Sequence, residues 1–465
     1  MSKVLISFMG IGDIDSRSYQ NVTYHFVKDG GDVTNEFISL AIRERYDIDK
    51  IILIGTKGSV WENIYHYLTG KEDETFVKLQ RTCSNYTLKE ELDQKEPTVP
   101  SIADMDKIEE ALGEESKIIL ITFGCNEAAQ RYNAERIMDL EKYIDNKDEV
   151  YVDITHSFRS LPMYLMNCLI YIQRVKNIKI SKILYGMREP GIDYVPVVEL
   201  NSALDIYDWI SGIDALINYG NGYVIYEKLQ QSHSKKDQKY ADDIADYSNV
   251  FNVNSISDIK PVINRLKKLK VEDMESKMGQ LALRSVIKEC KRLDAKSEEP
   301  ISSYLLELSR MQFERRNYGI AFLALKEAII YYIVEQNDDG AMITVNEKRS
   351  SNISNAINQC TFLRGEQRCV KHPQDNWWRS GYYDNRETEW VKNTLHGKDK
   401  LIITFCKING YRNGIAHLKQ NNADFNGYRN GIAHLKQKNA DFSTMINDLE
   451  DALAVVSSYL QANDL

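Results

Sequence analysis

The chain has 465 residues, of which 43% are hydrophobic and 27% are charged. These values are typical of folded proteins, and the length exceeds that of one ordinary core, so we expect two or three domains and no globally disordered chain. The formal net charge of −9 argues against a broad basic groove for long nucleic acid. Any contact with RNA should therefore be confined to a local patch.

The N-terminus and the cysteines restrict the compartment and the cofactors. The apolar run at residues 4–9 is too short for a signal peptide or a membrane span. The seven cysteines are scattered and never form C-x-x-C, so the sequence encodes neither a disulfide framework nor a zinc site. We expect a cytoplasmic protein with no membrane contact, no metal and no bound cofactor.

Up to about residue 200, short β-rich runs alternate with amphipathic helical patterns, which is typical of a mostly parallel sheet with helices on its faces. We predict strands at residues 3–9, 50–54, 116–123, 149–154 and 180–186, and a last hairpin-like run near 194–200. We predict helices at residues 34–46, 59–68, 126–145 and 161–175. Residues 1–200 should form one Rossmann-like α/β domain.

Beyond residue 200 the hydrophobic period becomes that of helices. Helices are predicted at residues 203–218, 276–293, 302–315, 318–335 and 443–460. The polar segment 230–246 and the Trp-, Tyr-, Arg- and Gly-rich segment 364–399 are interpreted as loops or inserts. This organisation predicts a helical linker over residues 201–300 and an all-α domain over residues 301–465.

The C-terminal part contains a tandem repeat. The segment NGYRNGIAHLKQNNADF begins at Asn409 and returns as NGYRNGIAHLKQKNADF at Asn426, 17 residues later. At about 100° per residue the copies would lie roughly 260° apart around a continuous helix, and their Asn-Gly pairs would interrupt such a helix. Both copies therefore cannot occupy equivalent places on one face.

The first strand is followed by a glycine-rich turn at the sheet edge where open α/β sheets bind ligands. Gly10 and Gly12 resemble the start of a dinucleotide fingerprint. However, Asp15 occupies the third glycine position, where its charge would repel a pyrophosphate. A conventional NAD site is therefore disfavoured.

Two further loops follow the second and third long strands. In GTKGSVW, Thr56 and Ser59 supply hydroxyls and Trp61 opens a helix, a combination that suits a phosphate or the edge of a base. Asn126 is predicted to be the N-cap of the next helix. The alternative is that both loops are ordinary strand-to-helix turns.

The most informative loop is DITHSFRSLP, which places an acid, two hydroxyls, an imidazole and a guanidinium between a strand and a helix. Arg159 can bind a phosphate bidentately, Thr155 and Ser157 can hydrogen-bond a ribose or phosphate, and Asp153 can orient the loop. His156 adds the imidazole. A capped turn carrying surface charges is the alternative.

The repeated RNGIAH segment contains the groups needed to cut RNA without a metal. Histidine can transfer the proton when a 2′-hydroxyl attacks the adjacent phosphate, and arginine can stabilise the added negative charge. The asparagine beside the arginine could orient either group. The candidate catalytic residues are Arg412, Asn413 and His417 in the first copy and Arg429, Asn430 and His434 in the second. The alternative is the end of a surface helix.

These motifs resemble two domains of CRISPR-associated ancillary ribonucleases of type III systems. The strand followed by G-x-G, the GTKGSVW loop and DITHSFRSLP resemble the CARF domain, over about residues 1–200. The R-N-x-x-x-H spacing, within the all-α residues 301–465, resembles the signature of HEPN ribonucleases. The duplicated motif departs from the HEPN pattern and leaves open which copy lies in the active cleft.

The resemblance implies a homodimer, or a higher oligomer, that senses a nucleotide. In this family, two CARF domains bind a cyclic oligoadenylate across their axis, and two HEPN domains pair to form one cleft. The implied ligand contacts are Gly10, Gly12, Thr56, Ser59, Trp61, Asn126, Asp153, Thr155, His156, Ser157 and Arg159. The implied function is a metal-independent endoribonuclease that cuts single-stranded RNA in antiviral defence, with cyclic tetra- or hexa-adenylate as the activator.

Two other functions compete with this hypothesis. A catalytically inactive nucleotide-sensing regulator or dimerising scaffold would use the RNGIAH segments as caps and turns. Base deamination lacks the H-x-E and P-C-x-x-C zinc pattern. The ring size of the activator, the RNA sequence preference and slow cleavage of the activator by the CARF pocket are left open.

Overall fold

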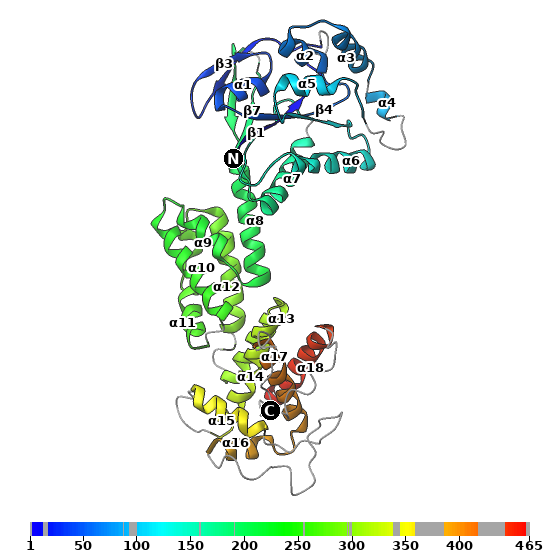
Figure 1. The fold of residues 1–465 in the computed structure, drawn as a ribbon. Coiled ribbons are helices and arrows are strands. Elements are labelled where there is room, and N and C mark those ends of the chain that lie inside the picture. Colours follow the sequence, from blue (N-terminus) through cyan, green and yellow to red (C-terminus); the bar gives the residue numbers. More distant parts are fainter. Residues whose placement is uncertain are drawn as a thin grey trace. The chain divides into compact units, whose positions relative to one another are not determined.

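The computed structural model describes residues 2–12, 17–86, 88–92, 100–157, 160–189, 191–253, 256–294, 296, 300–337, 345–358, 386–416 and 442–461. The chain divides into two compact units, Met1–Asp205 and Ile206–Leu465. Figure 1 shows the α/β elements of the first unit and the helices of the second.

An eight-stranded sheet forms the centre of the N-terminal unit. Its strands are β1 (Lys3–Met9), β2 (Val22–Phe26), β3 (Asp32–Asn35), β4 (Lys50–Thr56), β5 (Lys117–Ile121), β6 (Glu149–Asp153), β7 (Lys179–Gly186) and β8 (Tyr194–Glu199). Their order is β3-β2-β8-β7-β6-β1-β4-β5. The neighbouring strands β7, β6, β1, β4 and β5 are parallel, whereas β8 is antiparallel to β7 and β3 is antiparallel to β2.

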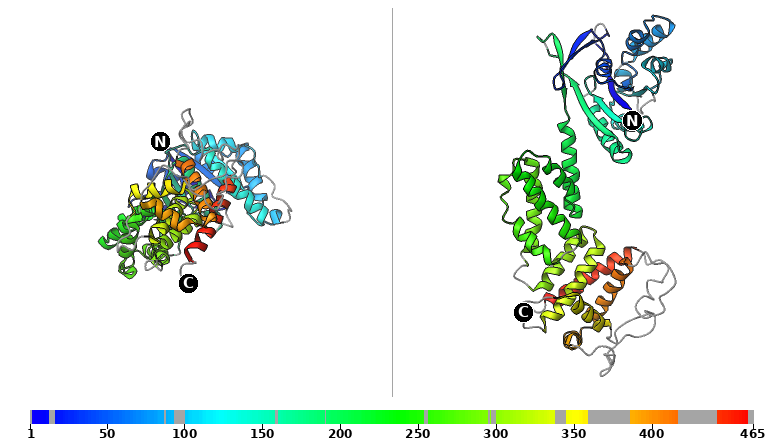
Figure 2. Two further views of the ribbon diagram at one scale, coloured as in Figure 1. Left: turned by 90° about the horizontal axis from the view of Figure 1, so that it is seen from below. Right: turned by 60° about the vertical axis from the view of Figure 1, so that its left-hand side comes forward.

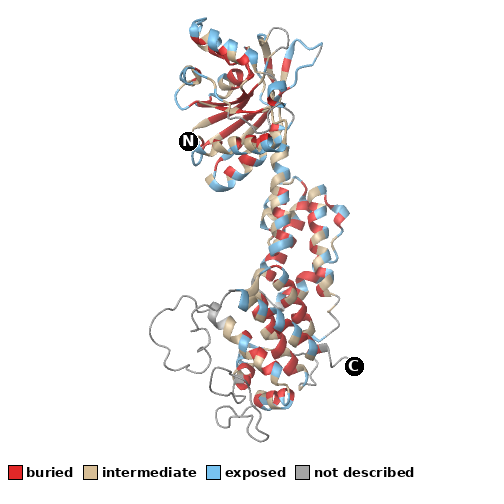
Figure 3. Ribbon diagram, turned by 90° about the vertical axis from the view of Figure 1, so that its right-hand side faces the viewer, coloured by how far each residue is buried: buried red, intermediate tan, exposed pale blue. Residues whose placement is uncertain are grey.

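Helices cover both faces of this sheet, so β1 and β4 are almost entirely buried and read as continuous apolar runs. One face packs against α1 (Ile38–Tyr46), α2 (Trp61–Thr69), α3 (Glu74–Asn85) and α5 (Met105–Leu112). The other face packs against α6 (Glu127–Met138), η1 (Asp139–Lys142) and α7 (Leu161–Lys176). The buried residues of the sheet are red in Figure 3.

The second unit is helical and has one continuous apolar core. Its helices are α8 (Ser202–Tyr219), which begins in the first unit, α9 (Tyr223–Gln230), α10 (Lys235–Val253), α11 (Ile256–Leu266), η2 (Val271–Asp273), α12 (Lys277–Asp294), α13 (Ile301–Glu314), α14 (Tyr318–Glu335), α15 (Glu347–Asn358), α16 (Arg386–Leu395), α17 (Asp399–Ala416) and α18 (Phe442–Gln461). Figure 2 shows these helices from two further directions, with α18 in red.

Polar contacts join α13, α14 and α18 beside their shared apolar core. Ser309 Oγ on α13 donates a hydrogen bond of 2.7 Å to the carbonyl oxygen of Ala321 on α14. Arg310 Nη2 on α13 donates to Ser457 Oγ on α18, also at 2.7 Å. With α17, which contacts both α14 and α18, these helices form a four-helix module.

The fold class expected from the sequence is confirmed: a mostly parallel N-terminal sheet precedes a helical C-terminal part. The strands β2 and β3 were not predicted, and the helix expected from residue 34 begins at Ile38. The edge strand β3 has four residues, of which only Val33 and Asn35 are buried. So short and half-polar a segment carries little periodic signal.

The polar segment 230–246 was wrongly interpreted as a loop, because most of it belongs to α10. The aromatic and aliphatic side chains of Tyr240, Ile244, Tyr247 and Phe251 are buried at helical spacing. The exposed positions between them carry polar residues: Asp242, Asp246 and Asn249. The prediction of a loop over 364–399 is also wrong at its end, where α16 buries Trp390. Residues 364–385 lie outside the described residues.

Candidate functional site

A buried carboxylate joins three strands at the carboxyl edge of the parallel sheet. Asp153, the last residue of β6, has no exposed surface. Its Oδ2 accepts a hydrogen bond of 2.6 Å from Ser7 Oγ on β1, and its Oδ1 accepts from the N–H (3.0 Å) and Oγ1 (2.6 Å) of Thr155. Thr155 Oγ1 in turn accepts a bond of 2.8 Å from the N–H of Gly186 at the end of β7. The ends of β1, β6 and β7 are thus held around one carboxyl group.

His156 follows this junction and carries an unused polar atom. Burial lowers the pKa of His156, and the opposing attraction of Asp153 does not restore it. The imidazole is therefore neutral at pH 7. Its Nε2 is buried and has no hydrogen-bond partner among the described residues. A buried polar atom without a partner is costly, so this nitrogen is a candidate contact for a ligand.

The glycine turn after β1 packs against the same imidazole through Tyr19. The ring centroids of Tyr19 and His156 are 4.6 Å apart, and the Gly10 N–H donates to the Tyr19 hydroxyl oxygen at 3.1 Å. A Cβ atom at Gly10 would lie 2.9 Å from that oxygen and 3.4 Å from the Cβ of His156. Gly10 thus permits this close approach, and Gly12 adopts a φ of +70° in the same turn. No sequence motif had indicated Tyr19.

The predicted residues of the GTKGSVW loop are buried and hydrogen-bonded within the protein. Ser59 Oγ donates to the carbonyl oxygen of Met9 at 2.6 Å and accepts from the N–H of Thr56 at 3.0 Å. The indole N–H of Trp61 donates to the carbonyl oxygen of Thr56 at 2.8 Å. A Cβ atom at Gly55 would lie 2.6 Å from the Trp61 ring. These side chains fix the shape of the turn and join the ends of β1 and β4.

The loop after β5 is held by a glutamate that no sequence motif had indicated. Glu91, on the short helix α4 (Leu88–Leu92), accepts hydrogen bonds from the N–H groups of Phe123 (2.8 Å) and Gly124 (2.9 Å). Tyr86 donates its hydroxyl to the same carboxylate at 2.7 Å, and its ring stacks on Phe123 with centroids 5.4 Å apart. Lys57 Nζ lies 5.8 Å from the centre of the Tyr86 ring. A cation and two aromatic rings thus gather here.

The remaining predicted contacts of this edge lie nearby in the fold or outside the described part. The N-cap prediction for Asn126 is confirmed, because its side chain accepts a hydrogen bond of 2.8 Å from the N–H of Ala129. Ser157 Oγ donates to the carbonyl oxygen of Ile154 at 2.8 Å. Arg159 lies outside the described residues.

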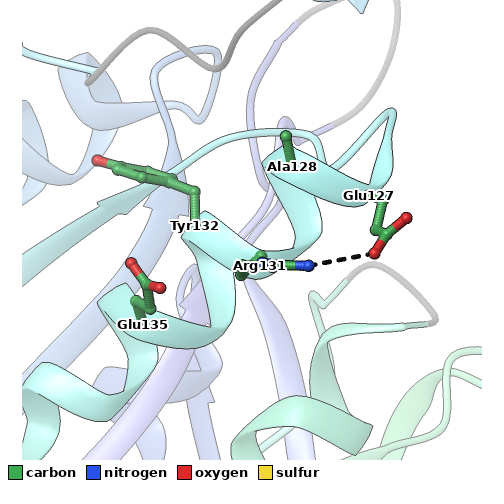
Figure 4. Close-up of a pocket in the computed structure, with 5 residues that line it drawn as sticks. All are labelled: Glu127, Ala128, Arg131, Tyr132 and Glu135. Carbon is green, nitrogen blue, oxygen red and sulfur yellow. Dashed lines mark hydrogen bonds and ion pairs between the residues drawn. The ribbon is translucent and has the colours of Figure 1, made fainter.

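Two surface pockets do not coincide with this edge. One, of about 580 Å³, is lined by α6 alone and contains the ion pair of Glu127 with Arg131 (Figure 4). The other, of about 450 Å³, is lined by Val22 and by residues of the turn before and the start of β8. Neither contains a predicted ligand contact, so neither replaces the sheet edge as the candidate site.

In the C-terminal unit, the first RNGIAH copy begins on a packed helix. Arg412 and Asn413 belong to α17, although only their backbone is described. The hydroxyl of the preceding Tyr411 donates a hydrogen bond of 2.6 Å to Asp448 Oδ2 on α18. The centroids of the Tyr411 ring and the Phe322 ring on α14 are 5.3 Å apart. Burial raises the pKa of Tyr411, so its hydroxyl keeps its proton. The other candidates, His417, Arg429, Asn430 and His434, lie outside the described residues.

Metal ligands and membrane spans can be assessed for the described residues. Within them, no group of three or more His, Cys, Asp or Glu side chains could hold a metal ion. No helix in that part of the chain is long and apolar enough to cross a membrane.

Comparison with known families agrees with the fold of the N-terminal unit. Residues 4–189 match the model of the CARF domain of the CRISPR system endoribonuclease Csx1. Residues 205–299 match the second domain of CRISPR-associated protein MJ1674. The N-terminal unit, with its mostly parallel sheet and its motif-bearing edge, is therefore a CARF domain, as the sequence motifs indicated. The whole chain is a CARF-containing protein related to CRISPR-associated ancillary proteins.

One curated relative and one solved structure can be compared over most of this chain. The CRISPR-associated protein MJ1674 of Methanocaldococcus jannaschii is 28% identical over 354 residues, which are 72% of this chain and 54% of that protein. The chain thus spans about half the length of this relative. The solved structure is Enterococcus italicus Csm6 bound to cyclic hexa-2′-fluoro-hexa-dAMP. Its alignment covers 99% of this chain and 94% of the Csm6 chain, at 13% sequence identity. Its TM-score of 0.32 is too low to establish a shared fold.

We predict that His156 titrates below the ordinary histidine pKa of about 6.5, because burial disfavours the imidazolium. The folded state favours the neutral ring of His156. The stability that this preference contributes is therefore complete above pH 6.5 and is lost as the pH falls through the lowered pKa of His156 in the folded protein. An NMR pH titration of the imidazole, assigned with His156→Gln, measures the midpoint. A midpoint at or above 6.5 would show that the ring is not desolvated as described.

Proposed function

We propose that this protein is a homodimeric, metal-independent endoribonuclease that cuts single-stranded RNA when a cyclic oligoadenylate binds its CARF domain. The observation that carries the proposal is the presence, on one chain, of a CARF domain and of an R-N-x-x-x-H motif that begins on a packed four-helix module. The module is proposed to be of the HEPN type. Its role would be antiviral defence in a type III CRISPR system.

The sheet edge around Asp153 offers the groups that an oligoadenylate requires. His156 Nε2 can hydrogen-bond a base or a ribose hydroxyl. Arg159 and Ser157 are proposed to bind phosphate, and the N-terminus of α6, capped by Asn126, favours negative charge. Thr56, Ser59 and Trp61 are proposed to act by holding the shape of their turn, because their side chains are buried. Gly10 and Gly12 are proposed to act by shaping their turn, because Tyr19 and the backbone of Ser18 occupy the space where side chains at these two positions would lie.

Exposed apolar side chains on one face of α7 support pairing of two CARF domains. Met163, Tyr171 and Val175 are 70%, 61% and 63% exposed. At helical spacing they lie within an arc of about 120°, which they share with the exposed Asn167 and Arg174. Large apolar side chains gathered on one exposed face are typical of an interaction surface. A second copy of this chain would bury them and bring two identical sheet edges to one ligand.

RNA cleavage can be written with the chain's own residues. The 2′-hydroxyl of the RNA attacks the adjacent phosphate and the 5′-oxygen leaves, which yields a 2′,3′-cyclic phosphate and a free 5′-hydroxyl. His417 would move the proton, Arg412 would stabilise the charge that develops on the phosphate, and Asn413 would orient the phosphate or the arginine. Two such motifs, one from each protomer, would line the cleft.

The first copy of the motif is the better candidate for the working copy. Its Arg412 and Asn413 are on α17, whose position is fixed by Tyr411 through Asp448 and Phe322. Groups that act on a transition state must be held in place, and a packed helix supplies that support.

We predict that His417→Ala lowers the rate of RNA cleavage by about 10²–10⁴-fold, the range for loss of a general acid–base group. His434→Ala, the matched change in the second copy, should leave the rate within about twofold of the wild type. Both are measured as initial rates on a fluorescent single-stranded RNA with cyclic tetra- or hexa-adenylate and EDTA. Both variants should bind the ring as the wild type does. If His434→Ala abolishes cleavage and His417→Ala does not, the assignment is reversed.

We also predict that Met163→Asp with Tyr171→Asp converts the dimer to a monomer, because two carboxylates would have to be buried in the paired surface. Sedimentation velocity measures the mass, and cleavage should fall with dimer content. Val77→Asp is the control, since Val77 is 56% exposed on α3, away from α7. A double variant that stays dimeric wherever the wild type is dimeric would exclude this face.

A further inference from the structure

Helix α12 presents a row of cations to solvent. The row contains four cations and one leucine, all exposed, which follow one another at intervals of four, three, four and three residues: Lys277, Leu281, Arg284, Lys288 and Lys291. At this spacing they lie within an arc of about 80° and extend for about 21 Å along the helix. We call these five residues the α12 cationic stripe.

The opposite face of α12 is anchored in the core of the helical unit. The buried residues on this face are Ala282, Leu283, Val286, Cys290 and Leu293. Because apolar packing fixes the rotation of the helix, the stripe is a defined surface on a rigid element. It lies in the region that matches the second domain of MJ1674.

Few carboxylates offset the charge of the stripe. Within the described part of the chain, one ion pair reaches it, between Glu272 Oε1 and Arg284 Nη2 at 4.0 Å. No ion pair to a described residue is seen for Lys277, Lys288 or Lys291. The exposed face of α10 in the same unit mixes lysines with Asp242 and Asp246. In a chain with a net charge of −9, the stripe is a local concentration of positive charge.

We propose that the α12 cationic stripe binds the phosphate backbone of single-stranded RNA and holds the strand while it is cut. The choice of substrate RNA as the bound polyanion rests on the proposed function. The existence of the cationic surface does not. Lysine and arginine on long stems neutralise phosphates without reading sequence. Leu281, which is 55% exposed between the cations, adds an apolar contact for unstacked bases.

The test compares two triple variants with the same change in charge. Lys277→Gln, Lys288→Gln and Lys291→Gln remove three cations of the stripe. Lys235→Gln, Lys236→Gln and Lys239→Gln remove three exposed lysines of α10 and serve as the control. Binding of a fluorescent 20-nucleotide single-stranded RNA is measured by anisotropy at several salt concentrations, without ring so that the RNA stays intact. Circular dichroism checks that both variants fold.

We expect the stripe variant to bind about 10- to 100-fold more weakly at 0.1 M salt, because three phosphate contacts are lost. Each phosphate contact contributes about 0.7 to the slope of log Kd against log salt concentration, so the loss of three contacts should lower this slope by about 2. The α10 variant should keep the wild-type slope. Wild-type affinity and slope in the stripe variant, or equal losses in both variants, would overturn the proposal.

Cleavage separates this proposal from the proposed function. With ring present, the stripe variant should cut the 20-nucleotide RNA with a lower kcat/KM but cut a dinucleotide RNA at the wild-type rate, since the single phosphate of a dinucleotide lies in the cleft and leaves none to contact the stripe. If the wild type binds RNA through the stripe but cuts none with any ring, the nuclease proposal fails and the surface stands. If it cuts RNA while the stripe variant binds normally, the surface proposal fails alone.

Discussion

The buried carboxylate of Asp153 is the interaction on which the candidate ligand site depends. It accepts hydrogen bonds from Ser7 and from Thr155, and Thr155 continues the network to Gly186. Burial raises the pKa of Asp153, and the hydrogen bonds that it accepts offset part of that shift. A carboxyl group held so tightly at the ends of β1, β6 and β7 fixes the loop that carries His156. Removing it would leave a serine and a threonine hydroxyl without their buried partner.

Around this junction, the protein's own side chains fill most hydrogen-bonding positions of the neighbouring turns. Ser59 and Trp61 close one turn, and Glu91 occupies the N–H groups of Phe123 and Gly124 in another. His156 Nε2 is an exception, because it is buried without a partner among the described residues. Rigid turns beside one unused polar atom are what a preorganised ligand site requires.

The sequence predicted the sheet because its parallel strands are long apolar runs, each followed by a polar loop. It also located the DITHSFRSLP loop, since no apolar core requires that set of side chains. It could not distinguish a hydroxyl that closes a turn, such as Ser59, from one that faces a ligand.

Glu91 and Tyr19 were missed because their partners are set by tertiary contacts; Glu91 lies 32 residues from Phe123 in the chain. Helix α10 was missed because polar residues dominate its composition, although Tyr247 and Phe251 are buried.

In the proposed mechanism, a ligand on one unit changes the activity of the other. Such coupling requires that the ring bind the cutting-competent state more tightly than the idle state. The four-helix module, with α17 held between α14 and α18 by Tyr411, supplies a rigid support for the first RNGIAH copy. Pairing of two such modules would complete the cleft, so a modest change in their arrangement would be enough to control cleavage.

The most direct test of this coupling is the initial rate at which the folded protein cleaves a fluorescent single-stranded RNA in EDTA, with cyclic tetra-adenylate, with cyclic hexa-adenylate and with neither. Typical coupling free energies correspond to about 5- to 150-fold, so we expect one ring to raise the rate by about tenfold or more. A folded protein that binds a ring while its cleavage rate stays unchanged, or that never cleaves, would contradict the proposed coupling and favour a nucleotide-sensing regulator.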